Sequence, residues 1–471
     1  MAQKDLFYAD IMATNSEVTG SCNLVIVRLP NDEKIRFVVD CGLYQEKEYN
    51  EKNHELPFDS EHIDFCLVTH NHVDHTGRLP LMVKQGFHHK IYATETTCKL
   101  LPLALADSYR VLRDVSKRKN CKSLYDEEDV ERVKTFLQPC KYNETIEIGE
   151  NVKVTFFNNG HLIGAAVILV QISYPGFENI NILFTGDYHW KNTFFDVEPI
   201  PESVLELPLT VIQEATYGNM ETSEIKPCFK ENVRKCIENG GSVVAMVFSL
   251  GRSQEILHEF QTMQNEGILN TDIPIYFDGK LAVRYTQMYL KEELGIKPEL
   301  KDFLPQNLTF VDKTNRCSVL ADTGTKIILT TSGMGSYGPA QLYIPEYITR
   351  ENVLIHFTGF TAEGTLGHRL KETKVGDVVE VGGLFAKKKA QVEYTTEYSA
   401  HAKADEMISF LQQFSNLKLI LVNHGESDVK NVFAERIVRE VDPKRVGVLG
   451  SEYFFRINPY GLVKTMSTKF K

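Results

Sequence analysis

Short apolar segments alternate with turn-forming residues through positions 1–200, and this pattern predicts closely spaced β-strands. The segments are rich in Val, Ile and Phe, which favour extended backbone. Strands spaced this closely predict sheets that pack against one another. The expected strands are 23–28, 35–39, 63–69, 152–157, 167–172 and 182–184.

The pattern becomes helical between about 97 and 138, where Val130, Val133 and Phe136 recur at steps of three residues. Four acidic residues at 126–129 open this segment, as is typical of a helix start. From about 215 to 390, strands alternate with helices, and this alternation predicts parallel α/β units. Glycine-bearing turns follow two of these strands, at 249–252 and 332–335, and such turns can hold phosphate at a helix start.

The chain has 471 residues, which predicts two domains or one domain with a large insertion. Hydrophobic residues make up 42%, as in soluble globular proteins, and no run of eighteen apolar residues or signal-like start is present. We therefore expect a cytoplasmic protein without membrane contact. Nine cysteines without a C-x-x-C pair argue against a disulfide framework and against a cysteine zinc site.

The formal net charge of −11 argues against a protein that binds phosphates over its whole surface. A local basic lining can still act within an acidic protein, and bound divalent ions carry their own positive potential. The run Lys387-Lys388-Lys389 is a candidate lining, although runs of this length are usually solvated surface.

The strongest chemical signal is the run His70-Asn71-His72-Val73-Asp74-His75, which places three imidazoles and a carboxylate in six residues. It follows an expected strand and precedes a chain break at 76–80. In extended backbone His70 and His72 point the same way, so they can bind one ion while the residues past the bend face another. Zinc suits these ligands best, and manganese or iron stays open.

Further ligands must come from elsewhere, and polar residues that can bind metal follow four apolar strands. These residues are Asp40, His161, Asp187 and His424. Each could singly be a loop residue or a helix cap. Their repetition at strand ends instead predicts a shared site.

The order Asp40, the 70–75 run, His161 and Asp187 resembles the metallo-β-lactamase fold hydrolases. Three later positions resemble the nucleic-acid-processing β-CASP branch: Glu214 in VIQEATYG, His401 in YSAHAKADEM and His424 in LVNHGES. Supporting segments are SLGRSQEIL at 249–257, TTSGMGS at 330–336 and AEGTLG at 362–367. The resemblance covers nearly the whole chain.

The resemblance implies an α/β fold: a four-layer αββα sandwich with an inserted α/β β-CASP domain. Its expected bounds are 1–213 and 398–471 for the sandwich and 214–397 for the insertion. It implies one zinc held by His70, His72 and His161, a second held by Asp74, His75 and His424, and a bridge through Asp187. Asp40 would orient the ligands from behind, and the catalytic residues would be Asp74, Glu214 and His401.

The expected reaction is hydrolysis of RNA phosphodiester bonds by hydroxide formed at two zinc ions, leaving 5′-phosphate and 3′-hydroxyl ends. His401 is the candidate general acid, and Glu214 would orient it and raise its pKa. By resemblance, histidine at 424 favours RNA over DNA, so the expected partner is single-stranded RNA. The sequence leaves open whether the enzyme acts as an endonuclease or a 5′ exonuclease, which RNA it cleaves, and whether it forms a homodimer.

Two other functions compete with a ribonuclease. The first is a metallo-hydrolase of a small ester, thioester or phosphodiester, which would suit the acidic charge but needs no inserted domain. The second is a non-catalytic scaffold, which would need no complete ligand set. One departure from the family pattern is the segment Ser399-Ala400-His401-Ala402-Lys403, where relatives usually read S-G-H-A-D. It weakens the expectation of 5′ exonuclease action.

Overall fold

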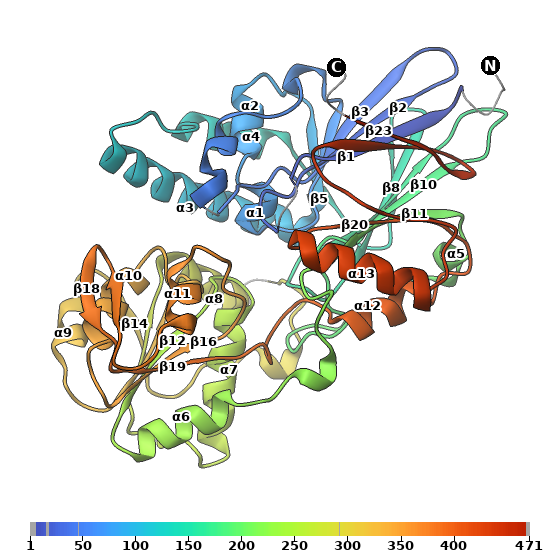
Figure 1. The fold of residues 1–471 in the computed structure, drawn as a ribbon. Helices are drawn as coiled ribbons and strands as arrows, with labels where there is room; N and C mark the ends of the chain where they lie inside the picture. Colours follow the sequence, from blue (N-terminus) through green and yellow to red (C-terminus); the bar gives the residue numbers. More distant parts are fainter. Residues whose placement is uncertain (1–5, 16–17, 46, 292, 468–471) are drawn as a thin grey trace. The chain divides into compact units, whose positions relative to one another are not determined.

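The computed structural model describes residues 6–15, 18–45, 47–291 and 293–467. The chain divides into two compact units (Figure 1). Unit 1 comprises 1–192, 196–222 and 400–471, whereas unit 2 comprises 193–195 and 223–399. Unit 1 is therefore built from both ends of the chain, and unit 2 mostly from the stretch between them.

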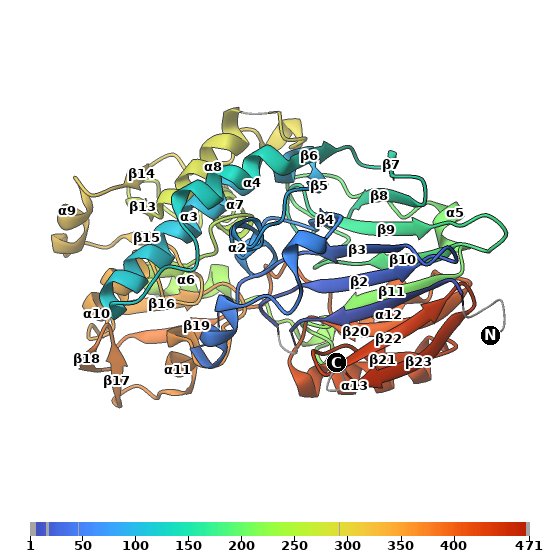
Figure 2. The same ribbon diagram turned by 90° about the horizontal axis from the view of Figure 1, so that it is seen from above.

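Unit 1 contains two sheets that face each other (Figure 2). One has eight strands, in the order β23 (Gly461–Ser467), β22 (Tyr453–Asn458), β1 (Tyr8–Ala13), β2 (Asn23–Arg28), β3 (Lys34–Val39), β4 (Phe65–Leu67), β5 (Lys90–Thr94) and β6 (Leu137–Cys140). The other has seven, in the order β21 (Val446–Val448), β20 (Leu417–Asn423), β11 (Leu209–Glu214), β10 (Ile180–Phe184), β9 (Ala166–Ile172), β8 (Val152–Asn158) and β7 (Thr145–Ile148).

Helices cover the outer face of each sheet. The eight-stranded sheet packs against α2 (Leu79–Lys84), α3 (Glu95–Lys119) and α4 (Glu127–Phe136), with the short α1 (Val73–Thr76) beside them. The seven-stranded sheet packs against α5 (Glu202–Leu205), α12 (Ala404–Leu411) and α13 (Ser427–Glu440). The order of layers is helix, sheet, sheet, helix, which confirms the predicted αββα sandwich.

Strand β9 shows why the inner strands read as continuous apolar runs. Val167 and Leu169 pack toward the helices on the outer face, whereas Ile168 and Val170 pack into the core between the sheets. Successive side chains on a strand point to opposite faces, so a strand covered on both sides needs apolar residues at every position.

Unit 2 is built around a six-stranded sheet whose paired strands all run parallel. The strand order is β14 (Leu308–Val311), β13 (Ile275–Asp278), β15 (Ile327–Thr330), β12 (Ser242–Met246), β16 (Val353–Phe357) and β19 (Gln391–Tyr394). Its helices are α6 (Phe229–Glu238), α7 (Arg252–Asn265), α8 (Lys280–Lys291), α9 (Arg316–Ala321), α10 (Ala340–Tyr347) and α11 (Leu366–Glu372). A two-stranded ribbon pairs β17 (Val378–Val381) with β18 (Leu384–Lys387).

One expected strand is shorter than its apolar pattern. The pattern predicts 63–69, but β4 spans only Phe65–Leu67. Beyond Leu67, the amide of Thr69 donates to a carboxylate oxygen of Asp40 instead of to a neighbouring strand. The chain therefore leaves the sheet just before the histidine run. Among the described residues, no helix has both the length and the apolar character needed to cross a membrane.

Candidate metal centre

Residues that follow strands of both sheets in unit 1 meet in one buried cluster. Asp40 and His424 come directly after β3 and β20, whereas His161 and Asp187 each lie three residues after β8 and β10. The run at 70–75 follows β4 and enters α1. Every residue that the sequence singled out as a metal ligand lies in this cluster.

The candidate ligands form two groups whose donor atoms lie within 4.8 Å of one another. One group is His70, His72, His161 and Asp187, and the other is Asp74, His75 and His424. The Oδ2 atom of Asp187 lies 3.3 Å from Nε2 of His75. Its Oδ1 atom lies 3.1 Å from Nε2 of His424. Asp187 therefore contacts both groups, as a bridging carboxylate would.

The spacing of the nitrogen atoms fits a tetrahedral ion. Nδ1 of His72 lies 3.1 Å from Nε2 of His70 and 3.2 Å from Nε2 of His161. Donors about 2.0–2.1 Å from a tetrahedral zinc are roughly 3.3 Å apart. In the described part of the chain, Nε2 of His75 and Oδ1 of Asp187 are buried without a hydrogen bond of suitable geometry. Buried polar atoms need partners, and an ion would supply them.

A small cavity accompanies the cluster. It has a volume of about 20 Å³ and is lined by residues that include Asp40, His75, Asp187, Glu214 and His424. This is room for one water-sized particle. The cavity reaches His75, Asp187 and His424 but not His70, His72 or His161, so the donor set, and not this space, is what fits a divalent ion.

Burial keeps several of these imidazoles neutral, as metal ligands must be. It lowers the pKa of His70 and His161 well below the ordinary value and that of His72 to about 3. Burial acts on His75 in the same direction, but Asp187 and Asp40 outweigh it and raise the pKa of His75 well above its ordinary value. The pKa of Asp187 is lowered well below its usual value, because His424 and His75 outweigh the opposing effect of burial.

Asp40 supports the cluster through contacts with Thr69 and His75. One of its oxygens accepts from the amide of Thr69 at 2.8 Å, and the other lies 2.8 Å from both the Thr69 hydroxyl and Nδ1 of His75. These contacts turn Nε2 of His75 toward Asp187. The sequence interpretation identified Asp40 but missed Thr69, whose hydroxyl also lies 3.1 Å from Nδ1 of His70. Its position directly before the histidine run was the available signal.

Backbone contacts fix the loop that carries Asp74. The amide of Cys41 donates to the His75 carbonyl at 2.7 Å, and the amide of Ser21 donates to the Asp74 carbonyl at 2.8 Å. Gly42 packs so closely that a Cβ on it would lie 1.5 Å from the Asp74 carbonyl oxygen. Only glycine fits there, so this backbone approach requires Gly42.

Glu214 and His401 form a second polar pair at the cluster. Oε2 of Glu214 lies 3.1 Å from Nδ1 of His401, and Oε1 accepts from the amide of Tyr188 at 2.8 Å. Burial opposes protonation of His401, but Glu214 outweighs it and raises the pKa of His401 above its ordinary value. Polar atoms of Asp187, Glu214 and His401 lie within 4.8 Å of one another, so the pair faces the candidate metal ligands.

The loop before α12 orients another ligand through its backbone. Nδ1 of His161 donates to the carbonyl oxygen of Ala400 at 2.8 Å, which leaves Nε2 to face His72. The sequence carries no signal for this contact, since every residue has a carbonyl.

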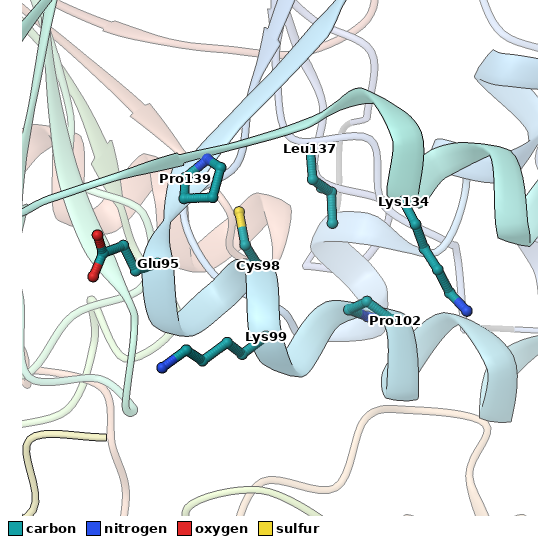
Figure 3. Close-up of a pocket in the computed structure, with 7 residues that line it drawn as sticks. All are labelled: Glu95, Cys98, Lys99, Pro102, Lys134, Leu137 and Pro139. Carbon is teal, nitrogen blue, oxygen red and sulfur yellow. The ribbon is translucent and has the colours of Figure 1, made fainter. Parts of the chain in front are cut away.

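A larger hollow of about 580 Å³ lies elsewhere on unit 1, between α3, the end of α4 and β6 (Figure 3). It is lined by Glu95, Cys98, Lys99, Pro102, Lys134, Leu137 and Pro139. None of these residues belongs to the candidate ligand groups within the described chain. Size alone therefore does not identify the chemical site.

Three family models match successive parts of the chain. A metallo-beta-lactamase superfamily domain matches 29–198, a Beta-Casp domain matches 253–370, and a Zn-dependent metallo-hydrolase RNA specificity domain matches 386–446. The first match lies in unit 1 except for residues 193–195, and the second lies in unit 2.

Relatives that match more than four fifths of this chain come from archaea, bacteria and eukaryotes. An RNase J-like protein of Methanocaldococcus jannaschii is 29% identical over 84% of this chain and 88% of that protein. Ribonuclease TTHA0252 of Thermus thermophilus is 28% identical over 88% of this chain and 91% of that protein. Endoribonuclease ysh1 of Schizosaccharomyces pombe is 28% identical over 82% of this chain and 51% of that protein. With the αββα sandwich and the three successive domain matches, these similarities confirm that the chain belongs to the metallo-β-lactamase/β-CASP family of metal-dependent hydrolases.

Proposed function

We propose that this chain is a zinc-dependent ribonuclease that hydrolyses phosphodiester bonds in single-stranded RNA and leaves 5′-phosphate and 3′-hydroxyl ends. The observation that carries the proposal is the Glu214–His401 pair, whose polar atoms face Asp187 in the cluster. Hydrolysis of a phosphodiester needs a nucleophile, charge neutralisation and a proton for the leaving oxygen. The cluster and the pair together offer groups for all three.

The proposed ligands follow the two groups seen in the cluster. His70, His72 and His161 would hold one zinc, Asp74, His75 and His424 would hold the other, and Asp187 lies within reach of both groups. When bound, two such ions would supply hydroxide at neutral pH and neutralise charge on the phosphoryl oxygens. Asp40 keeps Nε2 of His75 free for binding, because it accepts the proton of Nδ1.

His401 is the proposed proton donor to the leaving 3′ oxygen. Its Nδ1 is taken by Glu214, which leaves Nε2 as the atom that can transfer a proton. The side chain of Glu214 is only 1% exposed, whereas the side chain of His401 is 19% exposed and can contact a substrate. Glu214 thus orients the imidazole and keeps it protonated before transfer.

RNA is favoured as substrate by two findings. The family model that matches 386–446 is described as an RNA specificity domain. The relatives include proteins named ribonuclease and endoribonuclease. An enzyme for a small ester needs no second unit as large as residues 223–399. We therefore place RNA before a small-molecule substrate.

Incubation of the zinc-loaded chain with 3′-labelled single-stranded RNA and matched DNA tests the proposal. We expect cleavage of RNA with 5′-phosphate ends on the downstream products, and loss of cleavage in Asp74→Ala and His401→Ala. We expect His401→Ala to retain about two zinc ions per chain by elemental analysis, since His401 is no proposed ligand. Turnover of a small ester without cleavage of any RNA would refute the ribonuclease assignment.

A further inference from the structure

The carboxyl end of α3 carries an unusual concentration of positive charge. Residues 110–122 contain six Lys or Arg residues and a single acid, Asp114, in a chain with a net charge of −11. Arg110 forms an ion pair with Asp107, and a nitrogen of Arg113 lies 3.7 Å from Asp114. We call the remaining four cations the α3 basic end: Lys117, Arg118, Lys119 and Lys122.

All four side chains of the α3 basic end are exposed. In the ranges that the structure describes, none of them forms an ion pair with a carboxylate, and Arg118 donates only to the backbone carbonyl of Asp114. Their charge is therefore not neutralised within the chain. Cations are favoured at a helix carboxyl end, but the helix dipole acts only over the last turn and explains neither Lys122 nor the density of charge.

The acidic start of α4 lies too far along the helix to cancel the charge of Lys117, Arg118 and Lys119. Tyr125, which precedes the acids at 126–129, contacts Ser108 of α3, with 3.4 Å between the hydroxyl oxygens. A rise of about 1.5 Å per residue places Lys119 roughly 16 Å beyond Ser108 along the axis. At physiological salt, charges are screened beyond about 8 Å. In Figure 1 the carboxyl end of α3 extends past α4.

The surroundings of the α3 basic end favour a polyanion over an apolar partner. Between 105 and 125 of the described chain, Val111 is the one large apolar residue with as much as 36% of its surface exposed. A membrane surface or a protein interface core would need more apolar area. Binding to a phosphate backbone needs only cations that are free to displace counterions.

We propose that the α3 basic end is a phosphate-binding surface for single-stranded RNA, outside the candidate metal centre. This inference rests on the proposed ribonuclease function and extends it, since it assigns to the RNA a binding surface of its own. The surface would recognise the backbone and not the bases, because lysine contacts to phosphate carry no sequence information.

The test is the salt dependence of RNA binding by the triple variant Lys117→Gln/Arg118→Gln/Lys119→Gln. Binding of a fluorescent 20-nucleotide RNA is measured by anisotropy in the full-length chain, with Asp74→Ala in every protein to prevent cleavage. If the three cations each contact one phosphate, the slope of log Kd against log salt falls by about 2, and Kd at 0.1 M salt rises about 100-fold. Glutamine keeps helix propensity, and circular dichroism confirms that α3 is intact.

A matched control removes the same charge elsewhere. Lys226→Gln/Lys301→Gln/Lys313→Gln replaces three exposed lysines from separate segments, and we expect an unchanged slope. Equal slopes for the α3 variant and the parent would overturn the inference. Cleavage by the wild-type chain is assayed separately. Absence of any cleavage would count against the proposed function, whereas normal cleavage with equal slopes would count against this surface alone.

Discussion

Replacing Asp40 by asparagine tests whether this carboxylate sets the protonation of His75. Asp40 accepts from Thr69 through both oxygens, and Oδ2 also lies 2.8 Å from Nδ1 of His75. Asparagine preserves the shape but replaces one oxygen with an NH2 donor. Facing that donor, Nδ1 must become an acceptor, and the proton moves to Nε2. Because Nε2 is the atom that lies 3.3 Å from Asp187, His75 then loses its free lone pair toward the proposed ion.

The expected loss follows from the single contact that Asp40 makes with the ring of a proposed ligand. Removal of such a supporting carboxylate weakens metal binding by about 10- to 100-fold, which corresponds to roughly 1.4–2.7 kcal/mol. Titration of the metal-free chain with zinc against a competing fluorescent chelator measures this affinity.

Asp129→Asn is the matched control for that measurement. Asp129 is also buried, and it takes part in a capping box with Asp126 at the start of α4. We expect Asp129→Asn to lower the melting temperature slightly and to leave zinc affinity unchanged. An Asp40→Asn variant that binds zinc within twofold of wild type would refute the reasoning about the His75 proton.

Three further predictions follow from other contacts. Gly42→Ala should reduce bound zinc below two ions per chain by elemental analysis, because the added Cβ would lie 1.5 Å from the Asp74 carbonyl oxygen and force the loop to move. Glu214→Gln should lower kcat for RNA cleavage about 100-fold or more without loss of zinc, since it leaves His401 without a carboxylate partner; an unchanged kcat would contradict this role. Burial lowers the pKa of His356 to about 4. The unfolded chain, with a pKa near 6.5, therefore binds this proton first as pH falls, so the stability from neutral His356 is complete above pH 6.5 and drops by up to about 3 kcal/mol toward pH 4. His356→Asn should flatten the fall in melting temperature over that range, and parallel curves would contradict the prediction.

The predictable part of the site is the part that strand ends dictate. Asp40 and His424 directly follow strands that end in a run of buried, mostly apolar residues, and such strand ends are covered on both faces. A polar residue at the end of a buried strand emerges at the sheet edge, where the ends of neighbouring strands also lie. The sequence could therefore predict which residues meet. Their roles as zinc ligands stay predictions until metal is measured.

One part of the site was missed because backbone atoms make its contacts, and these atoms are the same in every residue type. The Ala400 carbonyl orients His161, but any residue at 400 would supply the same oxygen. Thr69 is different, because its side chain contacts Asp40 and both His70 and His75. A threonine at the end of a strand usually fits the pleat, so its β propensity hid its polar contacts. The boundaries of β4 were missed for the same reason.

The lysine at 403 shows how a departure from the family pattern can be accommodated. An ammonium in place of the usual acid would be unfavourable in a side chain that is only 2% exposed, unless nearby groups stabilise the charge. The Nζ atom of Lys403 lies 3.8 Å from the centre of the Tyr217 ring and donates to the His401 carbonyl at 3.1 Å. A desolvated cation over an aromatic face gains about 2 kcal/mol, and the hydrogen bond adds to this. The substitution therefore tethers the backbone of His401 to Tyr217, which explains how the loop keeps His401 beside Glu214 without the usual acid.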